Sequence, residues 1–88
     1  MKIIDIKHIG TNETRTDGRY PLRIGSEAKF CSNPCIGECM YLVYIKDNQG
    51  NYKGGRLRTS MVQNIERKEH QIVVSTLNSI YYFDTDKE

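Results

Sequence analysis

The stretch RLRTSMVQNIERKEHQIVVSTLNSIYYF, residues 56–83, decides the fold because it contains the two clearest β-strand patterns in the chain. Residues 71–76 (QIVVST) and 79–83 (SIYYF) are rich in β-branched and aromatic side chains, which favour strands. Only Leu77 and Asn78 separate the two runs, a spacing typical of a tight β-hairpin. The stretch therefore predicts β architecture, and it contains no residue pattern of a catalytic or cofactor site.

Four further segments have the composition or the alternation of β-strands. They are residues 2–9, 26–31, 39–45 and 52–59. The first alternates in part, so we expect an edge strand with Ile4 and Ile6 facing inward. The third, CMYLVYI, is the most apolar run of the chain, and neither of its faces is polar. It predicts a central strand that is covered on both sides.

The segments between these strands are expected to be loops and turns. Polar residues 10–18 predict a flexible surface loop. Residues 20–25 are apolar at every second position, which predicts an extended segment, with Pro21 at a sheet edge because proline has no backbone donor. Residues 60–65 predict a short turn or a single 3₁₀ turn. Residues 84–88 form a charged tail.

These elements predict an all-β fold, one domain over residues 1–88: a small antiparallel barrel or a strongly bent sheet of five to six short strands. The order of parts resembles that of SH3-like barrels, with a long polar loop after the first strand, a central hairpin and a 3₁₀-like turn before the last strand. Peptide-binding SH3 domains have an acidic loop and a tryptophan-lined aromatic groove, whereas this chain contains no Trp. The resemblance therefore does not imply proline-rich ligands. An OB-like barrel is the structural alternative.

Charge and cysteine content limit the class of protein. The formal net charge is +2, so nucleic-acid binding would have to rest on local clusters of Lys and Arg. No apolar run is long enough to span a bilayer, and charges interrupt residues 1–10, where a secretion signal would have its apolar core. Three cysteines cannot all pair within the chain. We expect a cytoplasmic protein without a membrane partner.

The candidate metal ligands are Cys31, Cys35 and Cys39, which stand at intervals of four in CSNPCIGEC. Three thiolates and a fourth ligand, His8 or His70, would suit zinc. The spacing differs from the usual C-x-x-C pair, however, and no second pair follows, so we predict no metal site and no cofactor. Neither histidine has a neighbour that marks it as an activated base, and we expect no enzymatic activity.

A nucleic-acid surface is indicated by a group of basic residues with tyrosines between them. The candidate binding residues are Lys53, Arg56, Arg58, Arg67 and Lys68, with Tyr52 as a stacking platform. Arg56 and Arg58 project from the same face of one expected strand. The alternative is that Glu66 or Glu69 pairs with these arginines on an ordinary solvated face.

Two functions fit these observations. We expect first a small binding or accessory module that acts through protein–protein contacts, because the apolar run at 39–45 needs a cover that a second copy or another protein would supply. Such a chain would self-associate. The second candidate is a nucleic-acid-binding barrel that uses the basic strand face.

Overall fold

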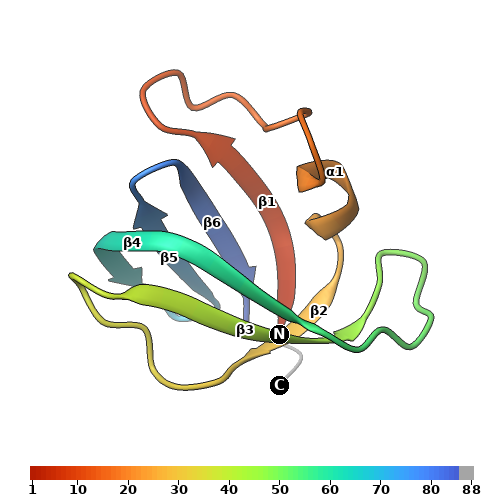
Figure 1. Ribbon diagram of the computed structural model, residues 1–88. Helices are drawn as coiled ribbons and strands as arrows, with labels where there is room; N and C mark the ends of the chain where they lie inside the picture. Colours follow the sequence, from red (N-terminus) through yellow and green to blue (C-terminus); the bar gives the residue numbers. More distant parts are fainter. Residues whose placement is uncertain (86–88) are drawn as a thin grey trace.

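The computed structural model describes residues 1–85 and contains six antiparallel strands and one short helix. The elements are β1 (Lys2–His8), α1 (Tyr20–Arg23), β2 (Glu27–Phe30), β3 (Cys39–Lys46), β4 (Arg56–Arg67), β5 (Gln71–Thr76) and β6 (Ser79–Asp84). Each strand pairs with the next one along the chain, and β6 pairs with β1, so that the sheet closes into a barrel (Figure 1). The predicted all-β antiparallel fold is confirmed.

The β5–β6 hairpin forms as the sequence predicts. Val74 lies opposite Tyr81, and residues of β6 alternate between the inside and the outside of the barrel. The turn is held by Thr76, whose hydroxyl donates to the Ser79 carbonyl (3.0 Å) and accepts from the Ser79 N–H (3.1 Å). Both polar side chains are buried. These two bonds satisfy the Thr76 hydroxyl, and the Ser79 hydroxyl accepts a hydrogen bond from the Arg15 guanidinium.

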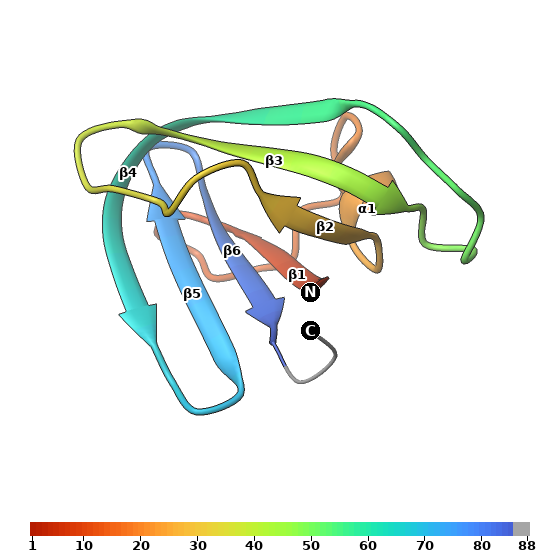
Figure 2. The ribbon, with the colours of Figure 1, turned by 90° about the horizontal axis from the view of Figure 1, so that it is seen from below.

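β4 is one long, bent strand that joins the two halves of the barrel. Its first half pairs with β3 and its second half pairs with β5 (Figure 2). The turn predicted at residues 60–65 is therefore wrong. A register shift between Val62 and Asn64 inserts an extra residue, so Val62 and Ile65 both pack toward the core although they are three residues apart. A β-bulge thus produces the spacing that had indicated a turn.

β1 is not an edge strand, because it pairs with β6 on one side and with β2 on the other. A register shift between Ile3 and Asp5 also interrupts its alternation. As a result Ile3 and Ile6 are buried, whereas Ile4 is 41% exposed, so the predicted inward position of Ile4 is wrong. The Asp5 carboxylate stabilises this bulge by accepting the Ile6 N–H at 2.8 Å.

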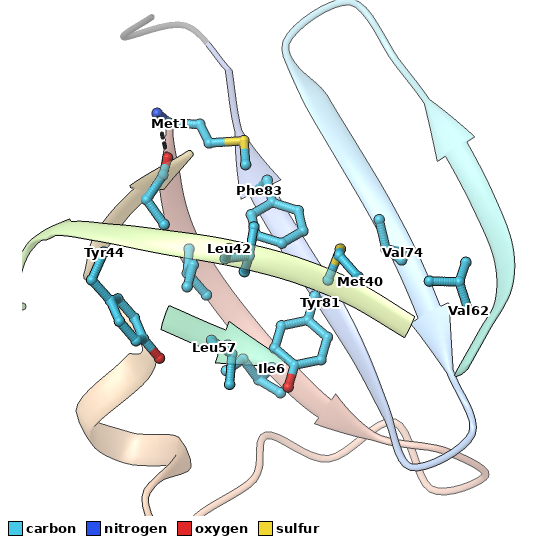
Figure 3. Close-up of a cluster of buried hydrophobic side chains, with 12 residues drawn as sticks. Met1, Ile6, Met40, Leu42, Tyr44, Leu57, Val62, Val74, Tyr81 and Phe83 are labelled. Carbon is cyan, nitrogen blue, oxygen red and sulfur yellow. Dashed lines mark hydrogen bonds between the residues drawn. The ribbon is translucent and has the colours of Figure 1, made fainter. Parts of the chain in front are cut away.

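The junction between β1 and β2 is short. The Ile3 N–H donates to the Ser26 carbonyl, and the Ala28 N–H donates to the Met1 carbonyl, each at 2.9 Å. The amino group of Met1 also donates to the Ala28 carbonyl at 3.2 Å (Figure 3). These few bonds complete the ring of strands.

The segment predicted to be extended at residues 20–25 instead contains the helix α1. Pro21 lies in its first turn, where the fixed φ angle of proline suits a helix and the missing N–H is not needed. Tyr20 and Ile24 pack against the core from this segment. Within residues 1–85, no helix has the length and apolar character to cross a membrane.

The loop at 10–18, predicted to be flexible, runs back along β1. Thr14 forms a β-bridge with Lys7, and the Arg15 N–H donates to the Ile6 carbonyl at 2.8 Å. The Arg15 guanidinium also donates to the Ser79 hydroxyl at 2.8 Å. Of the predicted tail, Asp84 is the last residue of β6, and residues 86–88 lie outside the described residues.

The barrel interior is filled by aliphatic and aromatic side chains from all six strands (Figure 3). The ring of Phe83, which is fully buried, meets Phe30 edge-on at 5.2 Å between ring centroids. β3 lies between β2 and β4, as expected of a central strand, but only its inner face is buried. On its outer face Tyr41 is 44% exposed and Val43 is 36% exposed, so the predicted second cover is not supplied by residues 1–85.

Leucine-to-alanine substitutions at two positions, one buried and one exposed, test the packing of the core. Leu42 is fully buried, so Leu42→Ala removes packed methyl groups and is expected to lower the free energy of unfolding by about 2–5 kcal/mol. Leu77 is 57% exposed, and Leu77→Ala is expected to change it by less than about 0.5 kcal/mol. Urea denaturation measures both values. Equal losses in the two variants would contradict this packing.

Candidate functional site

Strand alternation places basic and aromatic side chains together on the outside of β2, β3 and β4. Lys29 lies opposite Val43, which in turn lies opposite Arg56, and Tyr41 lies opposite Arg58. All five side chains are exposed. We call this group, Lys29, Tyr41, Val43, Arg56 and Arg58, the basic face.

A cleft of about 270 Å³ adjoins the basic face at Arg56. It lies between α1 and the connection from β3 to β4, which are on the same side of the barrel in Figures 1 and 2. Its lining contains four cationic side chains and no carboxylate. The lining residues are Arg19, Leu22, Arg23, Tyr44, Lys53, Gly54, Gly55, Arg56 and Leu57.

A close contact joins the two segments that border the cleft. The Asn48 side-chain amide donates to the Pro21 carbonyl at 3.4 Å and so ties the β3–β4 connection to α1. Gly25 has a φ of +92°, and a Cβ atom at this position would lie 3.0 Å from the Asn48 Cβ. Only glycine fits both the backbone angle and the space, so Gly25 allows the approach of the two segments.

Aromatic rings, and not carboxylates, position two of the cations in the cleft. The Lys53 Nζ lies 4.2 Å from the centre of the Tyr44 ring, and the Arg23 guanidinium lies 4.8 Å from the centre of the Tyr20 ring. Such cation–π contacts hold a side chain without cancelling its charge. Arg15 lies over the same Tyr20 ring at 4.0 Å, but Asp17 pairs with it at 2.7 Å.

The tyrosine hydroxyls near the cleft add no negative charge at neutral pH. In Figure 3, Tyr44 points its hydroxyl toward α1. Burial raises the pKa of Tyr44, and burial raises the pKa of Tyr81 to about 12. The nearby Arg23 guanidinium acts in the opposite direction on both pKa values, but burial outweighs it. Both phenols therefore stay protonated and neutral.

Six cations of the basic face and the cleft have no ion-pair partner among residues 1–85. They are Arg19, Arg23, Lys29, Lys53, Arg56 and Arg58. Glu66 pairs with Lys68 at 3.7 Å, and Glu69 pairs with His70 at 3.7 Å. In this structure the two glutamates therefore do not neutralise Arg56 and Arg58, as the alternative interpretation required.

The structure brings together some of the basic residues that the sequence indicated. Lys53, Arg56 and Arg58 lie close along the cleft and the first half of β4. Arg67 and Lys68 lie at the other end of this twelve-residue strand and in the turn that follows it. The stacking candidate Tyr52 is 88% exposed and precedes Lys53.

Sequence reasoning missed four residues of this surface, namely Arg19, Arg23, Lys29 and Tyr41. Arg19 and Arg23 stand four residues apart around Pro21, a spacing that puts two side chains on one face of a helix. Recognising α1 would therefore have indicated the pair. Lys29 and Tyr41 could not be placed without the strand register.

The cysteines and histidines do not assemble into one cluster. Cys31 and Cys35 are exposed, Cys39 is half-buried, and all three are free thiols. His8 and His70 lie 3.7 Å from carboxylate oxygens of Asp17 and Glu69. In the described part of the chain, no three His, Cys, Asp or Glu side chains are grouped so as to hold a metal ion.

Comparisons of the chain with protein-family models, with curated proteins and with solved structures gave no match. A function for the chain can therefore be inferred only from the geometry and charge of the surface itself.

The raised pKa of Tyr81 predicts a loss of stability in alkali. In the unfolded chain a tyrosine ionises near pH 10, whereas folded Tyr81 keeps its proton up to about pH 12. Its contribution is complete below pH 10 and is lost as the pH rises to 12, by an amount on the order of 2–3 kcal/mol. Denaturant unfolding at a series of pH values measures this slope.

Two phenylalanine variants isolate the hydroxyl responsible. Tyr81→Phe should reduce the dependence of the unfolding free energy on pH between 10 and 12, and exposed Tyr52→Phe should leave it unchanged. The interpretation fails if Tyr81→Phe keeps the full slope of the original protein.

Proposed function

We propose that this protein is a non-enzymatic binding module that holds a single-stranded nucleic acid on its basic face and in the adjoining cleft. The observation that carries the proposal is the set of six cations without ion-pair partners among residues 1–85 on one connected surface. Arg56 belongs to both parts and joins them. Phosphates that bind such cations release condensed counterions, which drives association at low salt.

Exposed tyrosines on or near this surface supply the second requirement of a single-strand binder. Tyr41 lies opposite Arg58 on the basic face. Tyr52 is 88% exposed and directly precedes Lys53, which lines the cleft. An unpaired base can stack on either ring, whereas a base within a duplex cannot. The combination of exposed rings and unpaired cations therefore favours single strands over duplexes.

The uncovered outer face of β3 supports a second candidate function, contact with a protein partner or with another copy of the chain. Tyr41 and Val43 are exposed there, and Met61 is exposed opposite Cys39 on the neighbouring strand. This is the function that the sequence alone favoured. Self-association would appear in sedimentation across a concentration series, and a strict monomer would count against it.

A likeness to SH3-like barrels and a cytoplasmic location belong to the same proposal. The long polar loop after β1 and the central β3–β4 hairpin support a likeness to SH3-like barrels. The free thiols of Cys31, Cys35 and Cys39 support a reducing, cytoplasmic environment.

A salt titration with labelled single-stranded DNA and RNA tests the proposed function. Affinity should fall steeply with salt, and Arg58→Gln should both weaken binding and reduce the log–log slope by about 0.7, the value for one lost phosphate contact on a single strand. Arg67→Gln, at the far end of β4, is the matched control and should change little. Binding that is insensitive to salt, or equal losses in the two variants, would refute the proposal.

Two substitutions at Tyr41 separate stacking from charge in the same assay. Tyr41→Ala should weaken binding by about 1–3 kcal/mol because the stacking surface is removed, while Tyr41→Phe should keep the affinity. If both variants bind as the original protein does, then Tyr41 does not stack on the strand.

A further inference from the structure

We infer that the cleft beside α1 is a phosphate subsite that takes the phosphate of a single nucleotide unit. Four positive charges gather here, since Arg19, Arg23, Lys53 and Arg56 line one space of about 270 Å³. The identity of the ligand rests on the proposed function, but the charge and shape of the cleft do not.

The size of the cleft fits a small ligand. Pockets for drug-sized molecules are commonly 300–1,000 Å³, and this cleft lies just below that range. Leu22, Leu57 and the ring of Tyr44 form apolar parts of its wall. A phosphate attached to a sugar and base would use both kinds of lining, because the phosphate meets the cations while the remainder contacts the apolar side chains.

Two of the four cations are positioned before a ligand arrives. The Tyr44 ring holds Lys53, and the Tyr20 ring holds Arg23, in each case without a carboxylate that a phosphate would have to displace. A preorganised site binds more tightly because less side-chain freedom is lost on binding. The planar guanidinium of Arg23 also suits two phosphate oxygens at once.

The backbone leaves room at the edge of the cleft. Gly55 has a φ of +107°, which favours glycine, and the position of its absent Cβ has no other atom within 4 Å. A side chain there would project into open space beside Arg56. Glycine instead leaves this part of the lining open to a ligand.

An NMR titration with adenosine 5′-monophosphate tests the subsite directly. At constant ionic strength, the nucleotide should give saturable shifts of the backbone amides of residues 53–57, and adenosine, which lacks the phosphate, should not. Arg19→Gln, a change at an exposed cleft residue, should weaken the nucleotide about tenfold, as expected for the loss of a charged contact. Arg67→Gln should have no effect.

Arg23→Gln is the second variant and should weaken nucleotide binding at least as much as Arg19→Gln does. Arg23 also lies near the buried hydroxyls of Tyr44 and Tyr81, so the NMR spectrum of Arg23→Gln is used to check that this variant is folded. If Arg23→Gln is unfolded, the nucleotide affinity of Arg19→Gln alone tests the subsite. Equal shifts with adenosine, or unchanged nucleotide affinity in Arg19→Gln, would overturn the subsite.

Oligonucleotides with and without a 5′-phosphate identify the source of the phosphate. If the 5′-phosphate strengthens binding only when Arg19 is present, the cleft takes a strand end. If Arg19→Gln weakens both oligonucleotides equally, the cleft takes an internal phosphate. Nucleotide binding without strand binding refutes the proposed function alone, and strand binding that depends on Arg58 but not on Arg19 refutes the subsite alone.

Discussion

Closure of the sheet by β1 is the constraint on which the rest of the structure depends. β1 hydrogen-bonds to β6 along one side and to β2 along the other, so a strand that would otherwise be an edge becomes part of a ring. Closure removes the unpaired backbone groups of two edges and encloses a single apolar interior. The two joints differ in extent. The ladder to β6 runs along the strand, whereas the joint to β2 rests on the few bonds around Ile3 and Ala28.

The surface follows from this enclosure. A strand in a closed barrel has one inner and one outer face, so away from the bulges every second residue of β2, β3 and β4 faces outward. The strand register then sets Lys29, Val43 and Arg56 side by side. The outward cations form one positively charged surface because no carboxylate among residues 1–85 pairs with them. Helix α1 and the β3–β4 connection extend this positively charged surface into the cleft, where neutral tyrosine rings contact Arg23 and Lys53. The basic face is thus a consequence of the strand alternation and register of the barrel.

Sequence alone predicted the parts of the fold that depend on local pattern. The β5–β6 hairpin and the all-β class are visible because β-branched and aromatic residues repeat over short distances. The bulges near Ile4 and Val62 were not predictable, since one inserted residue reverses the alternation that a pattern search assumes. Helix α1 is too short to show a period. In the same way, Arg56 and Arg58 could be grouped as neighbours on one strand, but their union with Arg19 and Arg23 depends on contacts between distant segments.

Amide hydrogen exchange measured by NMR tests closure of the barrel most directly. The N–H groups of Ile3 and Ala28 make the bonds between β1 and β2, and neither would be bonded in this way if the sheet were open. The structure predicts that both amides exchange far more slowly than those of the exposed residues 32–33 and approach the protection of the fully buried Val74. Exchange of Ile3 and Ala28 at the rate of those exposed residues, with Val74 still protected, would show an open sheet and contradict the account.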